Sequence, residues 1–259
     1  MTLAGTGGST RGSTCTRLPV VAIDGPAGAG KSTLARRVAE RAGLVYVDTG
    51  AMYRAVAYGV LRSGCATEPE LDASAVAAVA EAARIDLQEG PGGTRVLLDG
   101  EDVTAPIREP AVERLVPRVA SLAAVRRALV PQQRRMAYAG GVVLDGRDIG
   151  TTVLPDADCK FFVTAAFAVR VERRYRQLRR RGLDVDRHAV ARDLRERDAM
   201  DSERSIGPMV AAPDAVRLDT THLRVEDAVD LVLARCGLQD GATASAGPGR
   251  EVGGGAGEP

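Results

Sequence analysis

Several residue types are missing from this sequence or nearly so. It contains no asparagine and no tryptophan, and only two of its 35 basic residues, Lys31 and Lys160, are lysines. Without asparagine the chain cannot carry the Asn-Lys-x-Asp motif that GTPases typically use to select guanine, nor the asparagine-containing catalytic loop of protein kinases. Because the bias against lysine is consistent with codon usage, a lysine that is kept inside a motif is informative.

The sequence also lacks signals for a membrane span, for export and for a cysteine-based site. No apolar run approaches the roughly 20 residues needed to cross a bilayer, and the N-terminus has no charged segment followed by an apolar one. We therefore expect a reduced, cytoplasmic protein without a membrane partner. The cysteines show no CxxC or CxxxxC spacing, so they are interpreted as packing residues; they are Cys15, Cys65, Cys159 and Cys236.

Short apolar runs alternate with helical stretches along the middle of the chain. This alternation predicts an α/β fold with a parallel, doubly wound sheet. The expected strands are residues 20–24, 44–47, 142–145, 160–164 and 216–219. Helices are expected at 32–42 and 51–63, the first ending at Gly43. With 259 residues, of which 45% are hydrophobic, one main domain is the default.

Three segments depart from this alternation. Residues 1–18 and 240–259 are rich in small and polar residues and are predicted to be flexible tails. Residues 64–113 read as an insert that holds a helical piece and then a hairpin, with strands at 84–88 and 95–98.

A complete GxxxxGKS motif connects the first predicted strand to the first predicted helix. Its glycines allow backbone N–H groups to approach phosphate oxygens, Lys31 can reach the β and γ phosphates of a nucleotide, and Ser32 can offer a hydroxyl to Mg²⁺. The motif therefore predicts that the chain binds ATP and transfers its terminal phosphate to a small molecule. The expected ATP-binding residues are Gly25, Pro26, Ala27, Gly28, Ala29, Gly30, Lys31, Ser32 and Thr33.

Two charged clusters follow other predicted strands, at the edge where α/β sheets bind ligands. In the first, Thr49 and Arg54 can hold a second phosphate, although a helix cap with an exposed arginine explains the same residues equally well. In the second, Asp145 can order Mg²⁺ through water, and Arg147 and Asp148 present a donor next to an acceptor. This cluster alone can be a charged turn, but together the three motifs favour a substrate site.

Arginines dominate the stretch that follows. Arg197, Asp201 and Arg204 fall on one face of a helix, where they can form a surface ion-pair ladder or close over a phosphoryl-transfer site and exclude water. The arginine-rich segment 170–181 can suggest nucleic acid. Its helical apolar stripe, the net charge of +1 and an aromatic content of 3% favour a solvated or ATP-facing helix instead.

Taken in order, the motifs resemble those of bacterial cytidylate kinases, P-loop nucleoside monophosphate kinases. The similar segments are Asp24 with the P-loop, DTGAMYR, DGEDVT with Ile107-Arg108, VRRAL, DGRDIGT and RDxxDSxR, and they extend from about residue 20 to 233. The resemblance implies a three-layer P-loop kinase fold whose core is 19–63 and 114–239. It further implies an inserted nucleotide-binding segment at 64–113, a helical lid at about 170–207, and a monomer.

The resemblance also implies roles for individual residues. Arg126 and Asp148 would face cytosine, Arg197 and Asp201 the ribose, and Thr49, Arg54, Arg147 and Arg204 the phosphates. The expected catalytic residues are Lys31, Arg147, Arg197 and Arg204, and the expected metal-site residues are Ser32 and Asp145. The sequence departs from the family at Pro117, where a serine that touches the base is usual; Ser121 is no proven substitute.

The predicted reaction is phosphorylation of CMP or dCMP by ATP with Mg²⁺. Two alternatives stay open at this point. One is a P-loop kinase for another small acceptor, and the other is a regulator that binds ATP without turnover.

Overall fold

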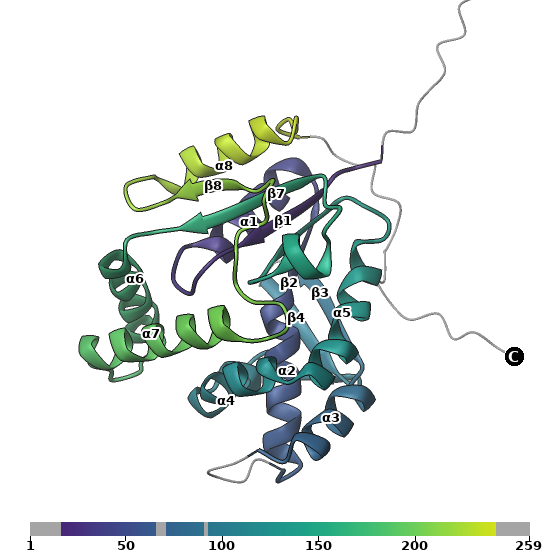
Figure 1. The fold of residues 1–259 in the computed structure, drawn as a ribbon. Coiled ribbons are helices and arrows are strands. Elements are labelled where there is room, and N and C mark those ends of the chain that lie inside the picture. Colours follow the sequence, from purple (N-terminus) through teal and green to yellow (C-terminus); the bar gives the residue numbers. More distant parts are fainter. Residues whose placement is uncertain (1–16, 66–70, 91–92, 242–259) are drawn as a thin grey trace, which may run out of the picture.

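The computed structural model describes residues 17–65, 71–90 and 93–241. Its centre is a five-stranded, fully parallel sheet in the order β2-β6-β1-β7-β8 (Figure 1). The strands are β1 (Val20–Asp24), β2 (Val45–Asp48), β6 (Val142–Asp145), β7 (Cys159–Thr164) and β8 (Val216–Asp219). The predicted parallel sheet is confirmed, and the bounds of β1, β6 and β8 agree residue for residue with those expected.

Helices cover both faces of this sheet, which gives three layers. On one face, α1 (Lys31–Ala42) and α8 (Val225–Arg235) pack against alternate strand residues such as Val21 and Val143. On the other face, α5 (Ala123–Ala137) and the π-helical turn η2 (Ile149–Val153) enclose a smaller core. The three-layer α/β fold expected from the sequence is therefore confirmed.

The ends of the described chain are attached to this core. The N–H of Gly141 donates to the Leu18 carbonyl at 3.0 Å. Arg41 binds both carboxylate oxygens of Asp240, at 2.5 and 2.6 Å, and its carbonyl accepts from the N–H of Gly241. Residues 17–18 and 240–241, which were predicted to belong to the tails, are therefore part of the folded core. The other tail residues, Cys15 among them, lie outside the described residues. Cys65, Cys159 and Cys236 pack against the cores, as expected.

The insert folds against neighbouring helices and shares their core. It contains α3 (Ala73–Ala82), an antiparallel sheet of β3 (Ile85–Gly90), β4 (Gly93–Leu98) and β5 (Glu101–Asp102), and the 3-10 turn η1 (Pro106–Arg108). These elements share buried residues with α2 (Thr49–Arg62), α4 (Pro110–Ser121) and α5. The predicted hairpin is confirmed, the two-residue strand β5 was missed, and part of the predicted turn, 91–92, lies outside the described residues.

Two helices extend from the carboxyl end of the sheet, α6 (Phe167–Arg180) and α7 (Arg187–Glu203) (Figure 1). The expected apolar stripe of α6 is only partly buried, and the most buried residue of this helix is Arg170. Arg170 donates to the carbonyl of Ala27 at 3.2 Å and pairs with Asp198 of α7 at 2.5 Å. The segment is therefore held by guanidinium contacts more than by an apolar core. None of the helices in the described part of the chain is long and apolar enough to cross a membrane.

Candidate active site

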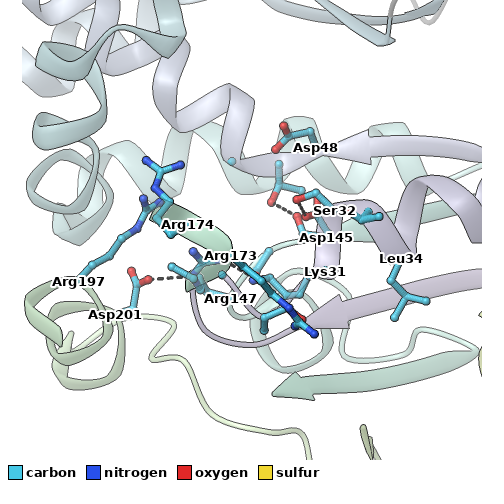
Figure 2. A pocket seen from close by; sticks show the side chains of 18 of the residues that line it. Lys31, Ser32, Leu34, Asp48, Asp145, Arg147, Arg173, Arg174, Arg197 and Asp201 are labelled. Atoms are coloured by element: carbon cyan, nitrogen blue, oxygen red, sulfur yellow. Dashed lines mark hydrogen bonds and ion pairs between the residues drawn. The ribbon is translucent and has the colours of Figure 1, made fainter. Parts of the chain in front are cut away.

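A cavity of about 840 Å³ lies at the carboxyl edge of the sheet and is open to solvent. It is lined by the loop between β1 and α1, the ends of β2 and β6, and residues of α4, α5, α6 and α7 (Figure 2). Of the residues that the sequence marked for ATP, acceptor or metal, Gly25 and Pro26 alone are absent from the lining. The structure therefore brings the separate sequence clusters together in one place.

Lys31 is the first residue of α1 and is 5% exposed. Its Nζ donates to the Pro26 carbonyl at 2.9 Å, so the ammonium folds back into the Gly-rich loop. Burial, followed by the nearby charge of Arg147, holds the pKa of Lys31 well below its usual range. The negative charge of a bound polyphosphate would offset this excess of positive charge and stabilise the charged form of the ammonium.

The residues expected at a metal site are in direct contact. Ser32 Oγ donates to Asp145 Oδ2 at 2.6 Å, and the hydroxyl of Tyr46 donates to Asp145 Oδ1 at 3.0 Å. Burial, and then the neighbouring Asp48, raises the pKa of Asp145. These are hard oxygen donors of the kind Mg²⁺ prefers. Among the described residues no three His, Cys, Asp or Glu side chains form a metal cage, so phosphate oxygens would have to complete the shell.

Asp48, Thr49 and Arg54 all line the cavity. Asp48 does cap α2 by accepting from the N–H of Ala51 at 3.0 Å. Arg54, however, is not an exposed helical arginine, because its side chain lines the cavity and pairs with Asp48 at 2.7 Å. Thr49 is buried and donates to the carbonyl of Asp145 at 2.7 Å. This geometry favours a substrate site over a surface cap.

Arginines from three elements converge on the opposite wall. Arg147 pairs with Asp201 at 2.8 Å, and Arg174 and Arg197 lie together on that side of the pocket (Figure 2). Burial, followed by the charge of Arg147, lowers the pKa of Arg197 to about 10. A buried guanidinium with cations as neighbours is costly unless an anion binds it.

A buried ion-pair cluster closes the far end of the cavity. Arg126 of α5 pairs with Asp148, and Arg204 Nη2 lies 3.1 Å from the other oxygen of the same carboxylate. Burial raises the pKa of Asp148, although both arginines oppose the rise. The expected helical face of Arg197, Asp201 and Arg204 is wrong in one detail, since α7 ends at Glu203 and Arg204 has extended backbone. From this position just beyond the helix, Arg204 reaches Asp148.

Three residues of this cluster were missed from the sequence. The hydroxyl of Tyr53 accepts from Arg126 Nη1 at 3.1 Å. Gln133 is fully buried on α5 and lines the cavity. Gly207 has a φ of 61° and presses its backbone against the Arg126–Asp148 pair. Tyr53 belongs to the recognised DTGAMYR segment, but nothing in the sequence distinguishes Gln133 or Gly207.

Pro117 supplies no polar group to the cavity. The wall formed by α4 consists of Val116 and Ala120. Ser121, considered as a substitute, is exposed and donates to the Arg118 carbonyl of its own helix at 2.7 Å. Polar recognition at this end therefore depends on residues from other elements.

The comparisons with known proteins agree with this site. The family model described as cytidylate kinase matches residues 21–237. The chain belongs to the cytidylate kinase family. A cytidylate kinase of Symbiobacterium thermophilum is 51% identical over 222 residues, covering 85% of this chain and 97% of the relative. One of Pelotomaculum thermopropionicum is 49% identical over 218 residues, covering 84% and 95%. A bifunctional pantoate ligase/cytidylate kinase of Synechococcus sp. (strain JA-3-3Ab) is 46% identical, over 84% of this chain and 40% of that protein.

Asp24 links the phosphate loop of this cytidylate kinase family member to the DGRDIGT segment. Its carboxylate accepts from the N–H groups of Ile149 and Gly150, each at 2.8 Å. Burial nevertheless raises its pKa to about 6. The folded state thus holds the proton more tightly than the unfolded chain does, and Asp24 lowers stability as pH rises from its ordinary pKa of 3.8 towards 6.

We expect this loss to disappear in Asp24→Asn. Between pH 4 and pH 7, the free energy of unfolding of the parent should fall by about 2 to 3 kcal/mol relative to that of the variant, since one pKa unit corresponds to about 1.4 kcal/mol. Urea unfolding at a series of pH values measures the difference. A pH-independent difference between the two proteins would show that Asp24 does not titrate in this range.

Proposed function

We infer that this protein transfers the terminal phosphoryl group of ATP to the phosphate of CMP or dCMP, giving ADP and CDP or dCDP. The carrying observation is a set of three orphaned donors in one cavity. The Nε atoms of Arg54, Arg126 and Arg197 are buried, and none has a hydrogen-bond partner among the described residues. Native proteins rarely leave buried donors unpaired. The three unpaired donors therefore favour a site that binds an anionic, polar ligand, as this function requires. Membership of the cytidylate kinase family supports it independently.

The proposed reaction needs no strong general base. The acceptor phosphate is already anionic, so one of its oxygens attacks the γ phosphorus directly while the bond to the bridging oxygen of ADP breaks. Lys31 would hold the donor phosphates, and Arg147 and Arg197 would neutralise charge between donor and acceptor. Alignment and charge neutralisation then carry the catalysis.

A Mg²⁺ ion fits the donor set at the end of β6. Ser32 Oγ and the Asp145 carboxylate would hold it together with phosphate oxygens, and the bound ion would supply charge neutralisation. The raised pKa of Asp145, caused by burial and by Asp48, indicates negative charge that a cation would relieve.

The acceptor end of the cavity suits cytosine. This base presents an amino donor at N4 and acceptors at N3 and O2, which the Asp148 carboxylate and the Arg126 guanidinium complement. Uracil would set its O4 acceptor against Asp148. Asp201 and Arg197 are the proposed ribose contacts, and Thr49, Arg54, Arg147 and Arg204 the proposed phosphate contacts.

A lid at about 170–207, an insert at 64–113 and a core at 19–63 and 114–239 are part of this proposal. Two contacts between α6 and α7 support a segment that moves as a unit. The Arg195 guanidinium lies 4.6 Å from the Phe167 ring centre and that of Arg187 lies 4.5 Å from the Tyr175 ring centre. Glu113 of α4, which lies outside this segment, pairs with Arg174 and would have to release it when the segment moves. A cytoplasmic monomer without a nucleic-acid partner also remains proposed.

The test is ADP release measured with CMP, dCMP, UMP and AMP as acceptors. We expect turnover with CMP and dCMP. Turnover with AMP but not CMP would assign the chain to another acceptor, and ATP binding without acceptor-dependent ADP release would indicate a regulator.

Gly207→Ala should damage the acceptor site specifically. A Cβ at Gly207 would overlap with Asp148 Oδ2 and with Arg126 Nη2, in addition to the unfavourable φ. We expect kcat/KM for CMP to fall by about 10²-fold, in the range found when an active-site donor is removed, while KM for ATP stays within a few fold.

Gly182→Ala is the matched control for this prediction. Gly182 has a φ of 78° in the same segment, but a Cβ there would meet nothing within 4 Å. It should lower stability by about 1 kcal/mol and leave turnover intact. Equal losses of turnover in the two variants would attribute the effect of Gly207→Ala to backbone strain alone.

A further inference from the structure

Gln133 is a buried polar side chain for which the proposed reaction has not yet given a use. It is 0% exposed, and neither its Nε2 nor its Oε1 has a hydrogen bond of ordinary geometry with any described residue. A carboxamide buried without partners destabilises a folded protein unless something else satisfies it. Gln133 also lines the nucleotide cavity, so a ligand in the cavity can do so.

The position of Gln133 on α5 directs it to the same end of the cavity as the ion pair. It lies seven residues after Arg126, which places the two side chains on one face of the helix, two turns apart. On the opposite side, α4 offers Val116 and Ala120, which have no polar side-chain atoms. The polar groups at this end of the cavity therefore come from α5, Tyr53, Asp148 and Arg204.

Tyr53 interacts with both Arg126 and the Gln133 carboxamide. Its hydroxyl oxygen already accepts from Arg126 Nη1. The Gln133 amide also acts on this hydroxyl so as to lower its pKa, opposing the larger rise that burial causes. With its N–H side towards the phenol oxygen, the carboxamide would leave Oε1 to a ligand in the cavity.

We propose that Gln133 Oε1 is a specificity-determining acceptor that takes one hydrogen of the N4 amino group of cytosine while Asp148 takes the other. The assignment rests on the proposed function and deepens it. The cytosine amino group has two hydrogens, and a single carboxylate oxygen satisfies only one of them in the plane of the base. Uracil would instead bring O4 against two acceptors, which strengthens its exclusion.

The variant Gln133→Met keeps the approximate length of the side chain and removes both polar atoms. We expect KM for CMP to rise and kcat/KM to fall by about 10- to 100-fold, with UMP turnover unchanged or raised, so that the CMP/UMP ratio drops at least tenfold. KM for ATP should not change. The midpoint of thermal unfolding should hold or rise, because an unpaired amide has been removed from the interior.

Gln132→Met is the matched control on the same helix. Gln132 is partly buried and donates to the carbonyls of Ala83 and Ala128, at 3.4 and 3.3 Å, away from the cavity lining. It should leave the CMP/UMP ratio unchanged. Gln133→Glu keeps an acceptor in the same shape but buries a carboxylate, so it is measured at a temperature where it is folded; there it should retain the preference for CMP.

The proposal is overturned if Gln133→Met leaves the CMP/UMP ratio within twofold of the parent. It is also overturned if the variant is less stable and its kcat/KM falls by the same factor for every substrate, ATP included. Calorimetric binding of CMP and UMP without ATP tests the role of Gln133 separately from the proposed reaction. If the parent protein binds CMP selectively but Gln133→Met loses that selectivity without any turnover in either, the role of Gln133 stands and the proposed reaction fails. If the parent phosphorylates CMP and Gln133→Met behaves like it, only the role of Gln133 fails.

Discussion

Replacing Lys31 with methionine should lower kcat by roughly 10³-fold, the upper range for loss of one preorganised donor at a developing charge. The ammonium is the only lysine side chain in the cavity lining and sits at the start of α1, folded into the phosphate loop. Its pKa is already depressed by burial and by Arg147. The ammonium charge therefore lowers the stability of the nucleotide-free protein, and a bound nucleotide would compensate for it.

Because the buried ammonium is unfavourable in the free protein, we expect its removal to lower activity without lowering stability. Lys31→Met removes a charge that burial and neighbouring cations disfavour, so the midpoint of thermal unfolding should hold or rise while steady-state turnover collapses. Lys160→Met is a direct control, because the chain has no other lysine and Lys160 pairs with the exposed Asp214. Retained turnover in Lys31→Met would contradict the role assigned to the ammonium.

The sequence was sufficient for the parts of the fold that depend on local chemistry. Residues 20–24, 142–145 and 216–219 were predicted as strands because short, mainly apolar runs alternate there with helical stretches, and all three proved correct. Gly43 ends α1 with a φ of 64°, as its position after a helical stretch predicted. Strand β5 was missed because two charged residues carry no alternating pattern.

The parts of the site that could not be predicted depend on contacts between distant segments. Arg170 lies in a helix rich in arginine, and no pattern tells which arginine will be buried; the Ala27 carbonyl and Asp198 decide it. Gln133 reads as an ordinary helical glutamine beside Gln132. Gly207 matters because of the ion pair that its backbone touches, and that ion pair joins α5 to the loop after β6.

The second large effect is expected at that ion pair. Asp148→Asn preserves the size of the side chain but replaces one acceptor oxygen with an amide donor. We expect kcat/KM for CMP to fall by about 10²- to 10³-fold, and the preference for CMP over UMP to shrink by more than that, because the new donor can face uracil O4. The substrate panel, repeated on the variant, measures both changes.

Stability should fall in the same variant, and for a separate reason. Arg126 and Arg204 would stay buried while losing the carboxylate that both of them contact, and breaking a buried pair from one side destabilises by about 3 to 5 kcal/mol. Asp184→Asn breaks an ion pair with Arg179 in which the side chains are 99% and 49% exposed, and it should change stability by no more than about 1 kcal/mol. Binding selectivity at a temperature where Asp148→Asn is fully folded then isolates recognition from stability. If the folded variant still prefers CMP as strongly as the parent does, the discrimination must reside elsewhere in the cavity, and Gln133 becomes the first residue to examine.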